Sequence, residues 1–244
     1  MNKLKFTFLL AVSLLSVFAQ AKDVDYSVLA PEDFMNMARY RMTLQNSFAD
    51  LYGQVTHLRR NQGGAVYYPV HFTVKFGSMI QARITVNNHE VHQLQKDHRS
   101  AFKNVTSNVP ANTPSILSSV GFKVEDLTMD FLDYKVTREY PAETVKTVQC
   151  RVLLLSNPAN GEQVKVWISK EYLFPLKAEF FAKGSDLNGK PERTLEITGF
   201  EKVNDYYVAT EISLFSSQYR TRIAFGNCKV YKADSPEAKA AFSK

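Results

Sequence analysis

The chain has 244 residues, a formal net charge of +6 and 45% hydrophobic residues, a composition typical of a folded globular protein and not of a disordered segment. Its lysines and arginines are spread along the sequence and form no basic stripe, which argues against a nucleic acid as partner. After the first twenty residues no segment has the ~18 consecutive apolar residues of a transmembrane helix.

Residues 1–21 have the pattern of a secretory signal peptide. Lys3 and Lys5 precede an apolar run from Phe6 to Phe18, and Ala19-Gln20-Ala21 has small residues where a signal peptidase cuts. The run is shorter than the ~20 residues that cross a bilayer, which disfavours a membrane anchor. We therefore expect cleavage after this tripeptide, export from the cytoplasm, and one mature domain over residues 22–244.

The segment Pro31–Asn46 has the spacing of an amphipathic helix. Phe34, Met37, Ala38 and Met42 fall on one face, and proline suits the first helical position. This apolar stripe fits either a helix packed permanently on a core or a lid over an apolar cavity. Methionine side chains suit a surface that repacks around different ligands.

Period-two alternation predicts half-buried strands in the next part of the chain, over residues 48–58, 66–76, 80–86 and 89–95. Residues 96–119 are rich in Ser, Asn, Pro and Thr and are predicted to form a mobile loop. A second helical segment is predicted over Lys123–Tyr134.

The C-terminal half is predicted to be a strand meander. Alternation marks strands over residues 148–155, 163–168, 176–180, 195–197, 206–214 and 219–225, and Asn188-Gly189 is a hairpin signal. The polar tail Ser235–Lys244 is predicted to be a frayed helix or disordered. We therefore expect an antiparallel up-and-down sheet of roughly ten strands.

The sequence carries no catalytic or metal-binding motif. It has no Gly-x-Ser-x-Gly, no His-Glu-x-x-His and no phosphate-binding glycine loop. His89 and His92 would point to opposite faces of a strand, so they are poorly placed to share a metal. Cys150 and Cys228 lack Cys-x-x-Cys spacing, and the sequence leaves open whether they form a disulfide. We expect a protein that is not an enzyme and that holds neither metal nor cofactor.

A curved antiparallel sheet with one large apolar face must bury that face. A barrel or half-barrel with helices across its mouth achieves this, so the fold class is mainly β with helices (α+β). If side chains do not fill the interior, it can hold an apolar ligand.

The stretch Val164–Glu179, which contains Trp167-Ile168-Ser169-Lys170 followed by Pro175-Leu176-Lys177, resembles the LolA-like outer membrane lipoprotein-sorting proteins. Several other segments fit the family in the same order: residues 126–132, 150–154, 188–191, 196–203 and 220–223. The resemblance is specific over about residues 126–225. It implies an unclosed antiparallel β-barrel capped by α-helices.

The resemblance also implies a function. The family holds acyl chains of lipoproteins in an apolar cavity during periplasmic transport to the outer membrane. The partners would be a lipid-modified protein or a lipid, together with transport components of the inner and outer membranes. An arginine that latches the lid is part of the family pattern, and Arg59, Arg60 and Arg83 are candidates. Two alternatives stay open: a periplasmic lipid or lipoprotein sensor that regulates an envelope-stress or membrane partner, and a scaffold with a filled core.

The alternation and the helical stripes supply candidate site residues. The predicted wall of the lipid-binding cavity consists of Phe72, Val74, Ile84, Val166, Ile168, Leu176, Phe180, Leu195 and Ile197. The predicted lid consists of Met35, Met37, Met42, Met129 and Phe131. The alternative for each wall residue is ordinary packing in a solid core.

Overall fold

The computed structural model describes residues 26–43, 46–97, 103–204 and 206–242. The predicted signal peptide therefore lies outside the described residues. Within these ranges no helix is both long enough and apolar enough to span a membrane. The described chain forms one twelve-stranded antiparallel sheet with short helices, which confirms the predicted mainly β class with helices.

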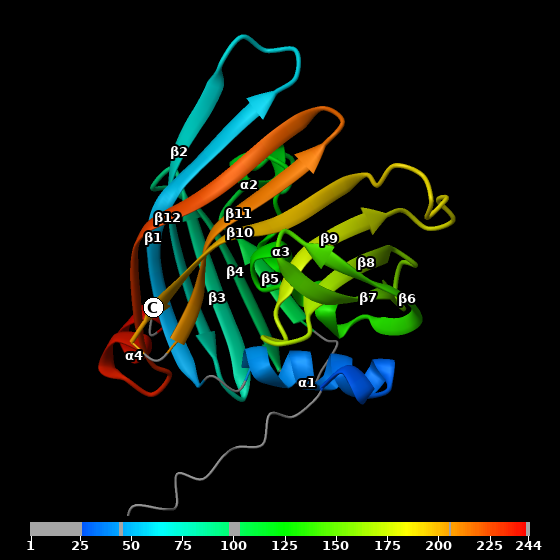
Figure 1. The fold of residues 1–244 in the computed structure, drawn as a ribbon. Helices are drawn as coiled ribbons and strands as arrows, with labels where there is room; N and C mark the ends of the chain where they lie inside the picture. The colour runs from blue at the N-terminus through cyan, green and yellow to red at the C-terminus, as the bar shows by residue number, and fades with distance from the viewer. Residues whose placement is uncertain (1–25, 44–45, 98–102, 205, 243–244) are drawn as a thin grey trace, which may run out of the picture.

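The first and last strands pair in the middle of the sheet, whose order is β5-β4-β3-β2-β1-β12-β11-β10-β9-β8-β7-β6. From this central pair the chain runs outward in simple hairpins on both sides (Figure 1). The strands are β1 (Ser47–Arg59), β2 (Ala65–Phe76), β3 (Met79–Val86), β4 (Glu90–Asp97), β5 (Lys103–Ser107), β6 (Lys135–Val145), β7 (Val148–Ser156), β8 (Gln163–Ser169), β9 (Pro175–Phe181), β10 (Arg193–Val203), β11 (Tyr206–Ser216) and β12 (Tyr219–Lys232).

The helices are short and lie mainly on one side of the sheet. They are η1 (Tyr26–Val28), α1 (Pro31–Thr43), α2 (Ile116–Ser119), α3 (Val124–Leu127), η2 (Asp130–Asp133) and α4 (Pro236–Phe242). In Figure 1, α1 crosses one end of the curved sheet, and α2 and α3 lie against its concave face. Pro31 begins α1, and Glu32 and Asp33 in its first turn favour the positive end of the helix.

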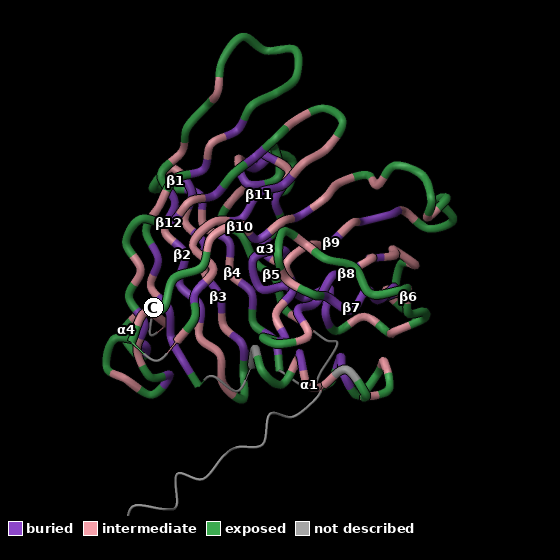
Figure 2. Tube along the Cα trace, in the orientation of Figure 1, coloured by how far each residue is buried: buried purple, intermediate pink, exposed green. Residues whose placement is uncertain are grey.

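The main hydrophobic core fills the space between the concave face and the helices. It contains Phe34 of α1, Leu117 of α2 and Leu127 of α3 together with side chains of both halves of the sheet. A smaller cluster around Cys150, Val152 and Trp167 packs apart from this core. Figure 2 shows the buried residues running along the inside of the curved sheet, with exposed residues at the hairpin tips.

The two outer strands of the sheet are protected against further pairing. Most residues of β5 and β6 are exposed. β6 contains Pro141, which has no backbone N–H to donate, and its pairing with β7 shifts register between Val136 and Arg138 and again between Tyr140 and Glu143. Such features discourage edge-to-edge association, so the sheet stays an open half-barrel.

Several sequence-based expectations differ from the structure. The segment 96–119 is not a continuous loop, because it contains β5 and α2 within its described part. The helix predicted over 123–134 is split into α3 and η2 by Met129, whose φ of 54° is left-handed and ends α3. Asn188-Gly189 lies in the connection between β9 and β10 and is not a two-residue hairpin. Cys150 and Cys228 are both free.

Candidate ligand-binding cavity

The concave face carries rows of apolar side chains that cross several strands. The first row, in the order of pairing from β1 through β12 and β11 to β10, is formed by Val55, Ile223, Ile212 and Ile197. The second row, across β1, β2 and β3, is formed by Leu51, Phe72 and Ile84. Directly paired residues on one face touch each other, so these rows form a continuous apolar wall.

The structure places most of the predicted wall residues in the main hydrophobic core. The members of the main core are Phe72, Val74, Ile84, Val166, Ile168, Phe180, Leu195 and Ile197. Leu176 is the exception, because it packs beside Trp167 in the smaller cluster. The pairing of β8 with β9 shifts register between Trp167 and Ile168, so the alternation that joins Leu176 to Phe180 in the sequence is broken here.

An apolar cavity of about 70 Å³ remains between the middle of the sheet and the helical segment. Only two of the predicted wall residues, Phe72 and Val74, line it. The other lining residues are Ser47, Ala49, Leu51, Phe76, Leu127, Met129, Phe174, Tyr206, Tyr207, Val208, Ala209, Ile212, Phe225 and Val230. Of the other predicted wall residues, six pack in the main core and Leu176 packs against the smaller cluster, and none of them lines this cavity.

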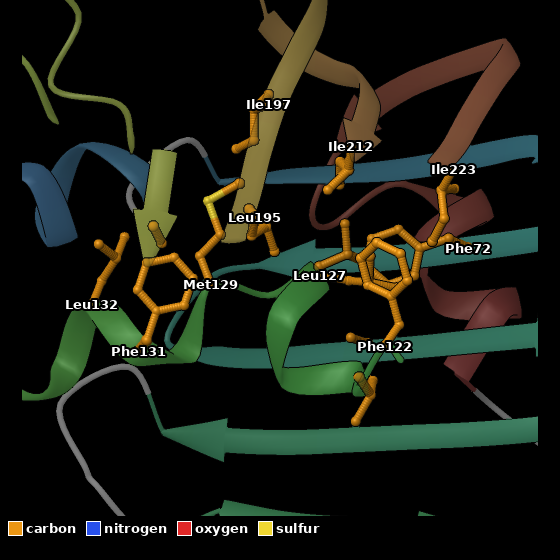
Figure 3. Packing of buried hydrophobic residues seen from close by; sticks show 14 of the residues in the cluster. Phe72, Phe122, Leu127, Met129, Phe131, Leu132, Leu195, Ile197, Ile212 and Ile223 are labelled. Atoms are coloured by element: carbon orange, nitrogen blue, oxygen red, sulfur yellow. The ribbon is translucent and has the colours of Figure 1, made fainter. Parts of the chain in front are cut away.

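The helical segment that contains α3 and η2 roofs the cavity. In Figure 3 the side chain of Met129 approaches Leu195 and Ile197, whereas Leu127 lies nearer Phe72 and Ile212; Leu127 and Met129 both line the cavity. Phe131 packs edge-on against Phe180, with 5.5 Å between ring centroids. Because aromatic edge-to-face contact adds to area burial, this contact fixes η2 on the strands beside the cavity.

The predicted lid residues lie in two places. Met129 and Phe131 are buried on the helical segment, and Met129 lines the cavity. Met35 is fully buried in α1 and Met37 is half-buried against the core. Met42 belongs to α1, but its side chain lies outside the described residues. α1 does not line the cavity in the described structure; it packs beside η2.

Buried ion pairs tie the helical segment to β4 and β5. The Nζ of Lys96 donates to Oδ1 of Asp130 at 2.7 Å and also contacts the carboxylate of Asp133. Only 3% of the Lys96 side chain is exposed. Lys103 of β5 contacts Asp130 and Glu125. These contacts keep charges paired where an unpaired charge would be costly.

Two further polar contacts hold α2 and α3. Glu90 of β4 accepts hydrogen bonds from the backbone N–H groups of Ile116 and Leu117 at 2.6 and 2.8 Å, and it contacts Nε2 of His92 at 2.7 Å. Burial alone would raise the pKa of Glu90, but these hydrogen bonds lower it below its usual value. Arg193 of β10 donates to Asp126 at 2.6 Å.

Arginines also join the N-terminal helix to the rest of the molecule. Arg39 of α1 donates from Nε to the carbonyl of Leu132 at 2.6 Å and from Nη2 to the carbonyl of Tyr134 at 2.8 Å. Arg151 of β7 donates to the carbonyl of Leu29 and lies 4.5 Å from the centre of the Phe34 ring.

The arginines that bond to α3, to η2 and to the segment around α1 differ from the three candidates taken from the sequence. Arg59 donates to His57 at 3.4 Å, and the backbone of Arg60 bonds to Gln218 near the β11–β12 turn. Arg83 lies beside Thr73 and Thr85 next to α4, at the side of the sheet away from the cavity. Sequence spacing gives no signal for the roles of Arg39, Arg151 and Arg193, because their partners are distant in the chain.

Comparison with solved structures identifies the same architecture elsewhere. A domain from Vibrio parahaemolyticus described as an outer membrane lipoprotein-sorting protein superposes with a TM-score of 0.65 at 14% identity, covering 83% of this chain and 93% of that chain. A DUF1329 family protein from Desulfovibrio piger gives 0.65 at 15% identity, covering 87% and 97%. A LolA superfamily protein from Nitrosomonas europaea gives 0.51 at 14% identity, covering 86% and 97%.

At these identities the likeness establishes the fold, which is the LolA-like unclosed barrel expected from the sequence. No curated protein sequence matches the chain. A family model described as "Uncharacterized protein" matches residues 111–238, which is more than half of the 244 residues. The chain therefore belongs to this family of uncharacterized proteins, and its fold is LolA-like.

Proposed function

We propose that this protein is a periplasmic carrier that binds acyl chains of lipoproteins or lipids in its apolar cavity and shields them on the way to the outer membrane. The observation that carries the proposal is the cavity itself, lined by Phe72, Val74, Ile212 and Phe225 and roofed by Met129. Its apolar lining suits hydrocarbon, and each CH₂ removed from water contributes roughly 0.8 kcal/mol.

The cavity of about 70 Å³ has room for only a few atoms, since one water molecule occupies about 30 Å³ of liquid. A complete acyl chain therefore requires the roof to move outward. Met129 and Phe131 would then act as a lid, with the polar contacts of Lys96 and Arg193 holding it closed. Met35, Met37 and Met42 of α1 complete the proposed lid beside η2.

Binding of this kind needs no bond chemistry. The free energy comes from transferring apolar surface out of water, and release requires only that the lid opens again. We accordingly propose that the protein works without a catalytic residue, metal or cofactor. The proposed mature domain covers residues 22–244, so N-terminal sequencing of the exported protein should begin at Lys22.

Mass spectrometry of the natively purified protein, combined with uptake of a fluorescent fatty acid, tests the carrier. We expect bound lipid or lipoprotein in the first measurement and saturable fluorescence in the second. Ala209→Asn puts an amide on the cavity wall and should weaken uptake, because burying an amide without partners is unfavourable. Ala224→Asn is the matched control, since Ala224 is also half-buried but does not line the cavity.

Absence of lipid together with absence of uptake would contradict the carrier and leave a scaffold with a small internal void. Capture of a membrane protein's soluble domain, with lipid changing the affinity, would instead favour a sensor. Equal uptake by wild type, Ala209→Asn and Ala224→Asn would place the binding site outside this cavity.

A further inference from the structure

Two neighbouring hairpins project together at one end of the sheet. β1 pairs with both β2 and β12, and Arg59 at the end of β1 lies opposite Tyr219 at the start of β12. Figure 1 shows the β1–β2 and β11–β12 turns at the same end, and Figure 2 shows that the β1–β2 turn is exposed. We call residues 58–67 and 216–220 the hairpin tip.

The hairpin tip exposes large apolar side chains. Leu58, Val66 and Tyr67 are 44%, 42% and 59% exposed. Leu58 lies opposite Ala65, and Thr56 lies opposite Tyr67, so Leu58 and Tyr67 share one face of the hairpin. Val66 lies on the other face, opposite His57. Both faces of the projecting end are therefore apolar, unlike a strand that packs on one side only.

The charge of the hairpin tip has a single sign. Neither residues 51–89 nor residues 212–233 contain an aspartate or glutamate. Arg59, Arg60 and Arg220 are exposed at the tip. In the described part of the chain, Arg60 and Arg220 make no ion pair, and the guanidinium of Arg220 lies 5.1 Å from the centre of the Phe215 ring. The tip thus combines unpaired cations with exposed apolar and aromatic groups.

We propose that the hairpin tip docks on the surface of a membrane that contains anionic lipid. Arginines near such a surface are attracted by its negative potential, and apolar side chains gain by entering the boundary between headgroups and acyl chains. Tyrosine is suited to this boundary because its ring is apolar and its hydroxyl is polar. One signal alone gives weak binding, whereas cations and apolar groups together give reversible docking.

Docking through the tip leaves the cavity free. Ser47 and Ala49 at the beginning of β1 and Tyr206 at the beginning of β11 line the cavity, whereas the tip is at the opposite ends of these strands. The inference therefore does not depend on the proposed carrier function. It would hold for a sensor or scaffold with the same surface.

Vesicle cosedimentation tests the charge. The protein should bind vesicles containing phosphatidylglycerol and not vesicles of phosphatidylcholine alone. Arg60→Gln combined with Arg220→Gln should weaken binding roughly 30-fold, because each arginine near an anionic surface contributes about 1 kcal/mol to the free energy of binding. The matched control is Lys229→Gln with Lys232→Gln, which removes the same charge from exposed residues at the far end of β12. Equal losses in both double variants, or equal binding to both vesicles, would overturn the proposal.

Fluorescence tests the apolar contact. The only tryptophan, Trp167, is 3% exposed, so a new indole at the tip is observed over a buried background. Tyr67→Trp should shift to the blue with anionic vesicles and be quenched by brominated acyl chains. Tyr172→Trp, at an exposed position away from the tip, should remain unquenched. An indole at position 67 that stays in water, or that is buried by self-association without vesicles, would contradict membrane docking.

Discussion

A chain of hydrogen bonds connects the base of the projecting hairpin to the end of α2. The hydroxyl of Thr221 donates to the carbonyl of Val120 at 2.6 Å, so it must accept at its contact of 2.7 Å with Nδ1 of His57. His57 therefore carries its proton on Nδ1, and Nε2 is free to accept from Nε of Arg59 at 3.4 Å. This arrangement requires neutral His57 and cannot tolerate a proton on both ring nitrogens.

The His57 chain predicts a loss of stability in mild acid. Burial, and then the positive charge of Arg59, lower the pKa of His57 below the ordinary 6.5. The unfolded chain therefore binds a proton that the folded protein does not, so stability present above pH 6.5 falls as pH drops toward the lowered pKa. Urea unfolding at pH 7.5 and 5.5 measures this difference.

His57→Gln should shrink the difference in unfolding free energy between the two pH values. His89→Gln is the control, because the His89 side chain is exposed and its Nδ1 contacts the nearby carbonyl of Asn87. An unchanged pH dependence in His57→Gln would mean that another group controls acid stability.

Two buried isoleucines, Ile168 and Ile212, should respond differently to truncation. Ile168 is fully buried and does not line the cavity, so Ile168→Ala should cost roughly 2–5 kcal/mol of unfolding free energy and leave fatty-acid binding unchanged. Ile212 lines the cavity, so Ile212→Ala should cost less and change binding more. Denaturant melts and fluorescence titrations measure both effects. The reverse order would move the ligand site toward β8.

Sequence alternation predicted which side chains face the core but not which of them border empty space. Phe72, Ile168 and Leu195 all follow the period of two, yet only Phe72 lines the cavity. Which of these side chains lines the cavity depends on the positions of Leu127 and Met129, and those positions are determined by contacts between segments far apart in the chain. Leu176 lies outside the main core for a local reason, because the register shift between β8 and β9 cannot be recognised from alternation alone.

At the level of elements, the alternating strands were predicted and β5 and β6 were not, and the helical segment 123–134 was predicted as one helix although it forms two. β3 alternates cleanly in burial because one of its faces is buried and the other is partly exposed to water. β6 is mostly exposed on both faces, so it has no alternation to detect. α3 and η2 have only four residues each, and their form depends on Lys96 and Arg193 from distant strands.

The ion pairs of Lys96 predict how the helical segment moves. Lys96→Met leaves Asp130 with Lys103 alone and removes the contact with Asp133. Removing one partner of a buried pair is strongly unfavourable, so residues 123–134 should exchange amide hydrogen faster while the sheet stays protected. Fatty-acid loading should accelerate in the same variant. Hydrogen exchange and stopped-flow fluorescence measure the two effects.

Lys177→Met serves as the control, because Lys177 pairs with Glu179 and lies over Trp167 in the smaller cluster. Faster exchange in Lys96→Met without faster loading would separate the movement of the segment from ligand entry.

In the whole molecule, the first and last strands, β1 and β12, pair with each other in the middle of the sheet. β1 and β12 are paired along their length, and the carbonyl of Ala224 would lie 2.1 Å from a Cβ at Gly53. Only glycine permits this approach, which coincides with the register shift between Tyr52 and Gly53. Such a long-range pairing leaves no local sequence pattern. The alternation therefore predicted a barrel or half-barrel, and only the family resemblance specified that it is unclosed.

The whole-molecule prediction concerns ligand-linked stability. We consider a fatty acid that binds only the folded protein and is present at a free concentration of 100 times its Kd. It adds about 2.7 kcal/mol to the free energy of unfolding, which should raise Tm by roughly 5–10 °C for a protein of this size. Ala49→Leu enlarges a side chain that lines the cavity, so it should fill the space and abolish this shift. Differential scanning calorimetry with and without fatty acid measures both proteins.

Ala82→Leu separates filling of the cavity from general overpacking. Ala82 is 1% exposed in the core and does not line the cavity, so the added carbons should lower stability by about 1–3 kcal/mol while the ligand shift persists. If both variants retain the full shift, fatty acid binds elsewhere on the protein. If both lose it, the shift reflects the integrity of the core as a whole and the cavity is not the specific site.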